Sequence, residues 1–272
     1  MRARLFSLSL MLIATCMQPS SAAVPTPLQP TTPWDLDYGE ANCTALRDYG
    51  DPAHPITLAI KPSPSGETYE LLVGRKRYGP EFAEEYEGSV DFGRGPIKAW
   101  LLHYGGNRTK LSLDQFRITA AQMADAQNAK SVTLRSTSAG DLTFALANMP
   151  ELLKGLEDCT ADLKHYWNFD GPGRARIAVP SKGEIRSIFR PQDYPAEAMR
   201  NHQEGRVQFM LLIDEQGKVA ACHIVQASGV PVLDGMGCQV IVERAKFKPA
   251  LDPQGKPVRS AYVTPPVVWK IG

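Results

Sequence analysis

The chain has 272 residues, of which 43% are apolar and 22% are charged, and its formal net charge is +1. This length suits two domains of moderate size. The almost neutral charge offers no electrostatic basis for binding nucleic acid, so the composition argues against that class of function.

The first residues have the composition of an export signal. Arg2 and Arg4 precede an apolar stretch from Leu5 to about Thr15, and the small residues Ser20-Ser21-Ala22-Ala23 follow. We predict a signal peptide over residues 1–23, cleaved after Ala22 or Ala23. An uncleaved membrane anchor over Leu5 to Met17 is the alternative, although this stretch is shorter than the roughly 20 residues that a spanning helix needs. A lipoprotein site at Cys16 is a further alternative, disfavoured by Thr15.

Four cysteines remain after such a cleavage, two in each half of the chain. An even number in an exported protein indicates disulfides. We predict pairing within each half, Cys43 with Cys159 and Cys222 with Cys238. The alternative for the second pair is two buried free thiols.

The Pro/Thr-rich residues 24–33 predict a disordered lead. Residues 34–167 predict an N-terminal α+β domain that is rich in strands and whose function is unknown. Two helices are expected. One runs over Ala120 to Ala129 with Thr119 as N-cap, and the other over Glu151 to His165, where Cys159 lies on the apolar face. The polar segment Pro80 to Gly88, with its acidic pair Glu84-Glu85, predicts a solvated loop. The expected strands are Ile56 to Lys61, Tyr69 to Arg75, Ile97 to His103, Val132 to Ser136 and Leu142 to Leu146.

Residues 168–189 contain Gly171-Pro172-Gly173 and lack periodicity, so they predict a linker. Residues 190–272 form a second, smaller domain. A short helix is expected at Pro195, then a hairpin of Arg206 to Ile213 and Lys218 to Gln226. A helix with Leu233, Met236, Val240 and Ile241 on one face follows. A last strand from about Val258 to Ile271 completes an αββαβ order.

This second domain resembles the C-terminal domain of the TonB energy-transducer family, whose motifs occur here in the same order and at similar spacing. The matching residues are Tyr194, Pro195, Ala198, Asp214, Gly217, Val219, Ser228, Gly229, Leu233, Asp234, Phe247, Pro249, Ala250 and Pro266. The resemblance implies that the strand of Cys222 packs against the helix of Cys238, which supports their pairing. It also implies a bacterial cell envelope and TonB-type transmembrane transport.

The chain departs from the TonB transducer pattern on two counts. Those proteins have a membrane helix and a long proline-rich spacer, whereas we expect the apolar stretch here to be a cleaved signal and the Pro/Thr-rich segment is short. We therefore expect a periplasmic protein released by signal cleavage, with the inner-membrane-anchored energy transducer as the alternative.

No local motif for catalysis or cofactor binding is present. The sequence has no His-x-x-x-His or Cys-x-x-Cys spacing for a metal and no Gly-x-Ser-x-Gly nucleophile motif. We expect a non-enzymatic protein without metal or cofactor. An enzyme or ligand-binding module in residues 34–167 is the alternative, and it requires a deep pocket with converging polar groups.

The resemblance implies that partners, envelope proteins such as outer-membrane transporters, bind by adding a strand to the edge of the last strand. A homodimer is a further alternative. Pro265 and Pro266 each remove a backbone donor, so we expect the ladder of an added strand to be split around Thr264 to Val267. The candidate binding residues are Tyr262, Val263, Val267, Val268 and Trp269.

Overall fold

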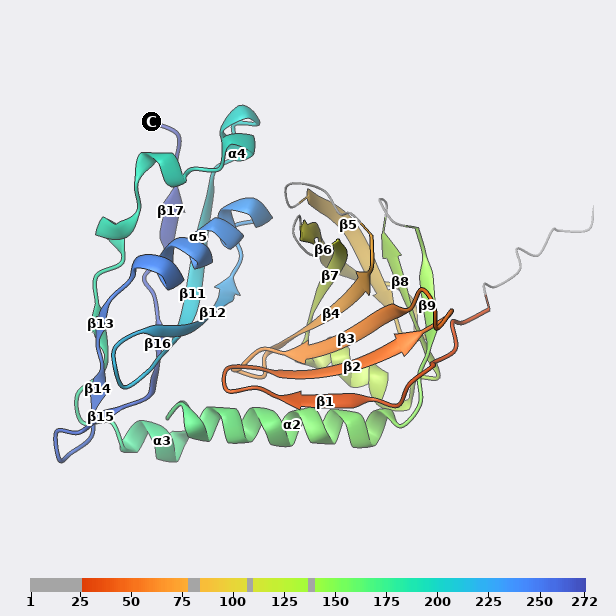
Figure 1. The fold of residues 1–272 in the computed structure, drawn as a ribbon, viewed down its shortest axis with the longest axis horizontal. Coiled ribbons are helices and arrows are strands. Elements are labelled where there is room, and N and C mark those ends of the chain that lie inside the picture. The colour runs from red at the N-terminus through yellow and green to blue at the C-terminus, as the bar shows by residue number, and fades with distance from the viewer. Residues whose placement is uncertain (1–25, 78–83, 107–109, 137–139) are drawn as a thin grey trace, which may run out of the picture.

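The computed structural model describes residues 26–77, 84–106, 110–136 and 140–272 (Figure 1). The predicted signal peptide and the alternative anchor lie outside these residues. Within the described ranges, no helix is both long and apolar enough to cross a membrane.

The N-terminal domain is built on one antiparallel sheet of nine strands. The order across the sheet is β1-β2-β3-β4-β7-β6-β5-β8-β9. The strands are β1 (Asp35–Tyr38), β2 (Cys43–Tyr49), β3 (Ile56–Pro62), β4 (Thr68–Arg75), β5 (Glu84–Asp91), β6 (Ile97–Gly106), β7 (Leu111–Thr119), β8 (Ser131–Ser136) and β9 (Leu142–Ala145).

The segment before β1 closes this sheet on itself. The Leu28 N–H donates to the Thr143 carbonyl of β9 (2.7 Å), and the Thr31 N–H donates to the Asp48 carbonyl of β2 (2.8 Å). This segment thereby bridges β9 to β2, and the sheet closes into a barrel (Figure 1). The expectation of a disordered lead over residues 24–33 is wrong from Thr26 onward, because Leu28 packs on the core and its backbone is paired; residues 24 and 25 lie outside the described ranges.

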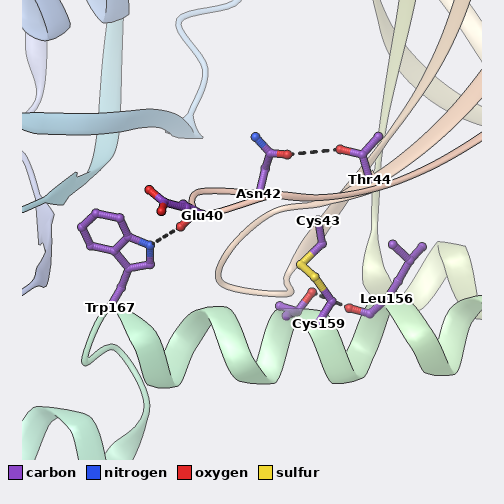
Figure 2. Close-up of a disulfide and its surroundings, with 8 residues drawn as sticks. Glu40, Asn42, Cys43, Thr44, Leu156, Cys159 and Trp167 are labelled. Atoms are coloured by element: carbon purple, nitrogen blue, oxygen red, sulfur yellow. Dashed lines mark hydrogen bonds between the residues drawn. A yellow bond between two sulfur atoms is a disulfide. The ribbon is translucent and has the colours of Figure 1, made fainter. Parts of the chain in front are cut away.

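The long helix α2 (Met149–Tyr166) lies across one side of the barrel, below β1 in Figure 1. Its face of Leu152, Leu156, Cys159 and Leu163 is buried in the same core as Cys43. The predicted disulfide between Cys43 of β2 and Cys159 is present (Figure 2). The helix thus extends the predicted one by two residues at its start and one at its end.

Beyond this disulfide, a second contact holds the end of α2. The indole N–H of Trp167 donates to the Glu40 carbonyl at 2.7 Å (Figure 2). The other predicted helix is shorter than expected: α1 (Ala120–Met123) continues as the 3₁₀ segment η1 (Ala124–Asn128). Thr119 does cap it, in a capping box with Gln122.

The five predicted strands of this domain are all present, and four further strands, β1, β2, β5 and β7, were not predicted. Glu84 and Glu85 belong to β5, where they pair with His103 and Leu102 of β6. The solvated loop expected over Pro80 to Gly88 is therefore wrong from Glu84 onward, and Pro80 to Ala83 lie outside the described residues.

The C-terminal domain has the predicted αββαβ order. It consists of α4 (Ala196–Arg200), β11 (Gly205–Ile213), β12 (Val219–Gln226), α5 (Pro231–Arg244), β16 (Ser260–Val263) and β17 (Val267–Trp269). Strand β11 is central: β12 pairs on one side, and β16 and β17 pair one after the other on the other side. The α+β fold class is confirmed, but the single last strand expected from Val258 to Ile271 is two strands.

The predicted linker, residues 168–189, is largely structured. It holds the helix α3 (Gly171–Ala175), the 3₁₀ turn η2 (Arg186–Ile188), and β10 (Lys182–Gly183), which pairs with β13 (Phe247–Lys248). Val179 also bridges Leu251 of β14 (Ala250–Leu251), the partner of β15 (Pro257–Val258). The segment forms no long helix or strand, but its short elements pair with the second domain, so it is not a free linker.

The two domains share an apolar contact. Leu212 of β11 is buried in the core cluster of the barrel, and Ala221 and Ala261 pack against the same cluster. The guanidinium of Arg259 stacks over the Tyr166 ring at 4.0 Å, at the end of α2. The sheet of the C-terminal domain therefore has α5 on one face and the barrel against the other.

Candidate partner-binding strand edge

The last strand is interrupted at Thr264-Pro265-Pro266. Val263 pairs with Met210 on one side of the break, and Val267 pairs with Val207 on the other. Four steps along the last strand thus match three along β11, so the break contains one extra residue. The prolines explain this, because neither can donate to a ladder.

One backbone bond and two side-chain bonds replace the regular ladder at this break. The Thr264 N–H donates to the Phe209 carbonyl at 2.8 Å, while the Phe209 N–H donates to the Thr264 hydroxyl at 3.1 Å. The Gln208 amide then donates to the Thr264 carbonyl at 2.8 Å. Thr264 is fully buried, so the break is a fixed part of the fold.

The outer flank of β16 carries unpaired backbone groups. Since the Thr264 N–H points toward β11, alternation along an antiparallel strand turns the N–H and C=O groups of Ala261 and Val263 to the opposite flank. Among the described residues, no strand pairs with that flank of β16 or of β17. An extended guest chain therefore has an edge to which it can add.

The five predicted binding residues differ in exposure and form three groups. The side chains of Val263 and Val268 are exposed, at 49% and 62%. Tyr262 and Val267 are partly buried, and Tyr262 stacks edge-on against Phe247 with 5.0 Å between ring centroids. Trp269 is buried, so its indole contributes mainly to the core.

A pocket that the sequence did not predict adjoins β17. Its volume is about 510 Å³. The aromatic rings of Phe189 and Tyr194 lie edge-on to Trp269, each with a centroid distance of 5.5 Å. The pocket is lined by Arg186, Phe189, Arg190, Pro191, Tyr194, Pro266, Val267, Val268, Trp269 and Lys270.

A partly buried ion pair fixes the wall of this pocket. Asp193 accepts from both terminal nitrogens of Arg244 on α5, at 2.7 and 2.8 Å, and from the Arg190 N–H at 2.7 Å. The hydrogen bonds from Arg244 are the main reason that the pKa of Asp193 is lowered. The turn that carries Phe189 and Tyr194 is thus held against α5.

The second predicted disulfide is also present and joins Cys222 of β12 to Cys238 of α5. No group of three or more metal-ligating side chains occurs within the described ranges. The N-terminal domain has a groove of about 620 Å³ beside α2, whose polar lining includes Tyr69, Gln127, Glu157 and Lys164.

The fold defines a small αββαβ domain with an unpaired strand edge at β16 and β17 among the described residues. Residues 190–271 match the family model described as Gram-negative bacterial TonB protein C-terminal, which confirms the resemblance over this segment. No curated protein and no solved structure matches the chain. TonB proteins are non-enzymatic, cell-envelope-associated energy transducers of transport, and their C-terminal domains interact with envelope proteins such as outer-membrane transporters.

Proposed function

We propose that this protein is an exported, non-enzymatic periplasmic protein that binds envelope proteins of the outer-membrane transporter type by strand addition, as part of TonB-type transport. The observation that carries this proposal is the unpaired outer flank of β16. There Ala261 and Val263 present backbone groups, and the Val263 side chain is exposed. In strand addition, main-chain hydrogen bonds supply the affinity and side-chain pockets supply the specificity.

The interrupted edge bears on the strength of such a complex. Strands β16 and β17 have four and three residues, so a guest chain meets two short pairing segments with a break between them. Each intramolecular hydrogen bond contributes only about 1 kcal/mol net. We therefore expect reversible binding, which suits a partner that is engaged and released.

Site-specific photo-crosslinking in the cell envelope tests this function. A photoreactive residue at Val263 or Val268 is expected to form an adduct with an outer-membrane transporter, identified by mass spectrometry. Val242 on α5 is the matched control, because its exposure of 46% is close to the 49% of Val263. Equal adducts from Val242, or none from either edge position, would contradict the proposal. An adduct with a second copy of the chain would instead indicate a homodimer.

An inner-membrane-anchored energy transducer is the alternative for the same edge. It differs in the N-terminus, because Leu5 to Met17 would then remain on the protein. Mass spectrometry of the exported protein distinguishes the two: a start at Ala23 or Val24 supports release, and retention of Met1 supports the anchor.

The groove beside α2 supports a second function, ligand binding by the N-terminal domain. Leu153 lines this groove and is partly buried. A ligand of the groove should raise the melting temperature of the wild type but not that of Leu153→Trp, whose larger ring fills the space. Equal shifts in both proteins would place the ligand elsewhere.

A further inference from the structure

A pocket of about 480 Å³ lies beside the last turns of α2, on the side away from the groove described above. Its walls come from α2 and from residues Tyr38 to Glu40 at the end of β1. An α-helix turns once in about 3.6 residues, so Asp162 and Tyr166, which line this pocket, lie opposite Leu153 and Glu157, which line the groove. The two are therefore separate sites, and we call this one the tyrosine pocket.

The tyrosine pocket combines two accessible aromatic rings with an apolar base. Tyr38 is 60% exposed and Tyr166 is 38% exposed, whereas Cys159 and Leu163, which also line the pocket, are buried. Tyr166 already binds one cation, because the guanidinium of Arg259 stacks over its ring at 4.0 Å. The negatively polarised face of a tyrosine ring attracts cations, so these rings suit a positively charged ligand that is partly apolar.

The tyrosine pocket also carries negative charge. Glu40 and Asp162 line it and are exposed, and no lysine or arginine lines it. The Trp167 indole binds the backbone carbonyl of Glu40, so this contact leaves the Glu40 carboxylate free (Figure 2). Within the ranges that the structure describes, neither carboxylate forms an ion pair. A concave surface lined by one sign of charge concentrates ligands of the opposite sign.

Two cations near the pocket have carboxylate partners of their own. Arg259 pairs with Glu215 at 3.2 Å. Arg176 donates to the backbone carbonyl of His165 at 3.2 Å and interacts with the charge of Asp170, whose carboxylate also contacts the His165 ring at 3.2 Å. These positive charges are balanced outside the pocket, so the two carboxylates of its lining remain available to a cation.

We propose that the tyrosine pocket binds a quaternary ammonium group of the trimethylammonium kind. Such a group has a delocalised positive charge and methyl groups but no N–H donor, so aromatic faces, an apolar base and nearby carboxylates meet its requirements. A metal ion would instead need several ligands in direct contact with it, and no such group of side chains occurs among the described residues. This binding is independent of the strand edge of the C-terminal domain.

Choline and its uncharged analogue dimethylbutanol, in which carbon replaces the quaternary nitrogen, test the inference on the full exported chain. In an NMR titration at low salt, we expect choline to shift the amide resonances beside the pocket and dimethylbutanol to bind more weakly. Tyr38→Leu should weaken choline binding about two- to fivefold, because it removes one exposed cation–π contact. Tyr38→Phe keeps the ring and should bind choline as the wild type does.

The double variant Glu40→Gln/Asp162→Asn should weaken choline binding at least about twofold. Glu151→Gln/Glu157→Gln is the matched control, because it removes the same charge from exposed positions of α2 outside the pocket. Unchanged melting temperatures would show that the variants fold. The inference is overturned by no binding of choline, by equal affinity for dimethylbutanol, by equal losses in Tyr38→Phe and Tyr38→Leu, or by equal losses in the two double variants.

Co-sedimentation with phosphatidylcholine vesicles identifies the source of the ammonium group. Vesicle binding that Tyr38→Leu weakens would assign the pocket to a lipid headgroup, and binding of choline without vesicle binding would assign it to a soluble compound. Both outcomes support the pocket as a site for quaternary ammonium groups.

Discussion

The two disulfides differ greatly in the loop that each closes, and this difference leads to a quantitative prediction. Cys43 and Cys159 are separated by 116 positions in the sequence, and Cys222 and Cys238 by 16. A crosslink removes conformational entropy from the unfolded chain in proportion to the logarithm of loop length. The expected stabilisation is about 5 kcal/mol for the first bridge and about 3 kcal/mol for the second.

Paired alanine variants measure these contributions. Alanine is preferable to serine because Cys43 and Cys159 are buried, and a hydroxyl there would add a separate desolvation cost. Under oxidising conditions, Cys43→Ala/Cys159→Ala should lose about 2 kcal/mol more unfolding free energy than Cys222→Ala/Cys238→Ala, as measured by denaturant titration. Single replacements such as Cys222→Ser should likewise lower the melting temperature only under oxidising conditions.

The same titrations in a reducing agent are the control. Reduction opens both bridges of the wild type and the remaining bridge of each variant, so the unfolding free energies of the three proteins should converge. The reasoning is refuted if the short-loop variant loses as much stability as the long-loop variant, or if reduction leaves the differences between proteins unchanged.

Two further predictions concern backbone and charge. Gly217 and Gly255 both occupy turns with positive φ, at 77° and 79°, but a Cβ on Gly217 would lie 2.0 Å from the Phe247 carbonyl oxygen, whereas Gly255 has open space. Gly255→Ala should cost about 1 kcal/mol of unfolding free energy, and Gly217→Ala at least about 2 kcal/mol more, as calorimetry can measure; equal costs would contradict this. Burial, followed by the nearby Lys61, lowers the pKa of His223 to about 4 from 6.5. Protonation therefore disfavours the folded state, and stability is complete above about pH 6.5 and falls by up to about 3 kcal/mol as the pH approaches 4. His223→Phe should remove this part of the pH dependence, and an identical pH profile in the two proteins would contradict the assignment.

The C-terminal domain was readable from the sequence because its local signals agree with its tertiary structure. The Asp214 to Gly217 turn places glycine where φ is positive, and Asp214 caps the turn through the N–H groups of Gln216 and Lys218. The division of the last strand was only partly foreseen. Two adjacent prolines predict lost donors, but the role of Thr264 as a substitute partner depends on β11, which is distant in sequence.

The N-terminal domain was harder to predict because some of its strands turn polar residues inward. On β7, Ser112 and Asp114 are buried, and Asp114 is held by Arg75 and His103 from neighbouring strands. Such a strand lacks the apolar alternation by which strands are recognised. The pocket beside β17 was not predicted for a different reason: Arg186 of η2 and Lys270 after β17 are distant in sequence and line one pocket only in the folded protein.

The contact between the domains limits how a partner can approach. Strand β16 begins next to Arg259, which is stacked on Tyr166 at the end of α2. The face of the sheet that carries Leu212 is already occupied by the barrel, so a visiting polypeptide has lateral access only. Because Arg259 also accepts a hydrogen bond from the Asn168 side chain, the end of α2 and the barrel that carries it border the start of the edge at Ser260.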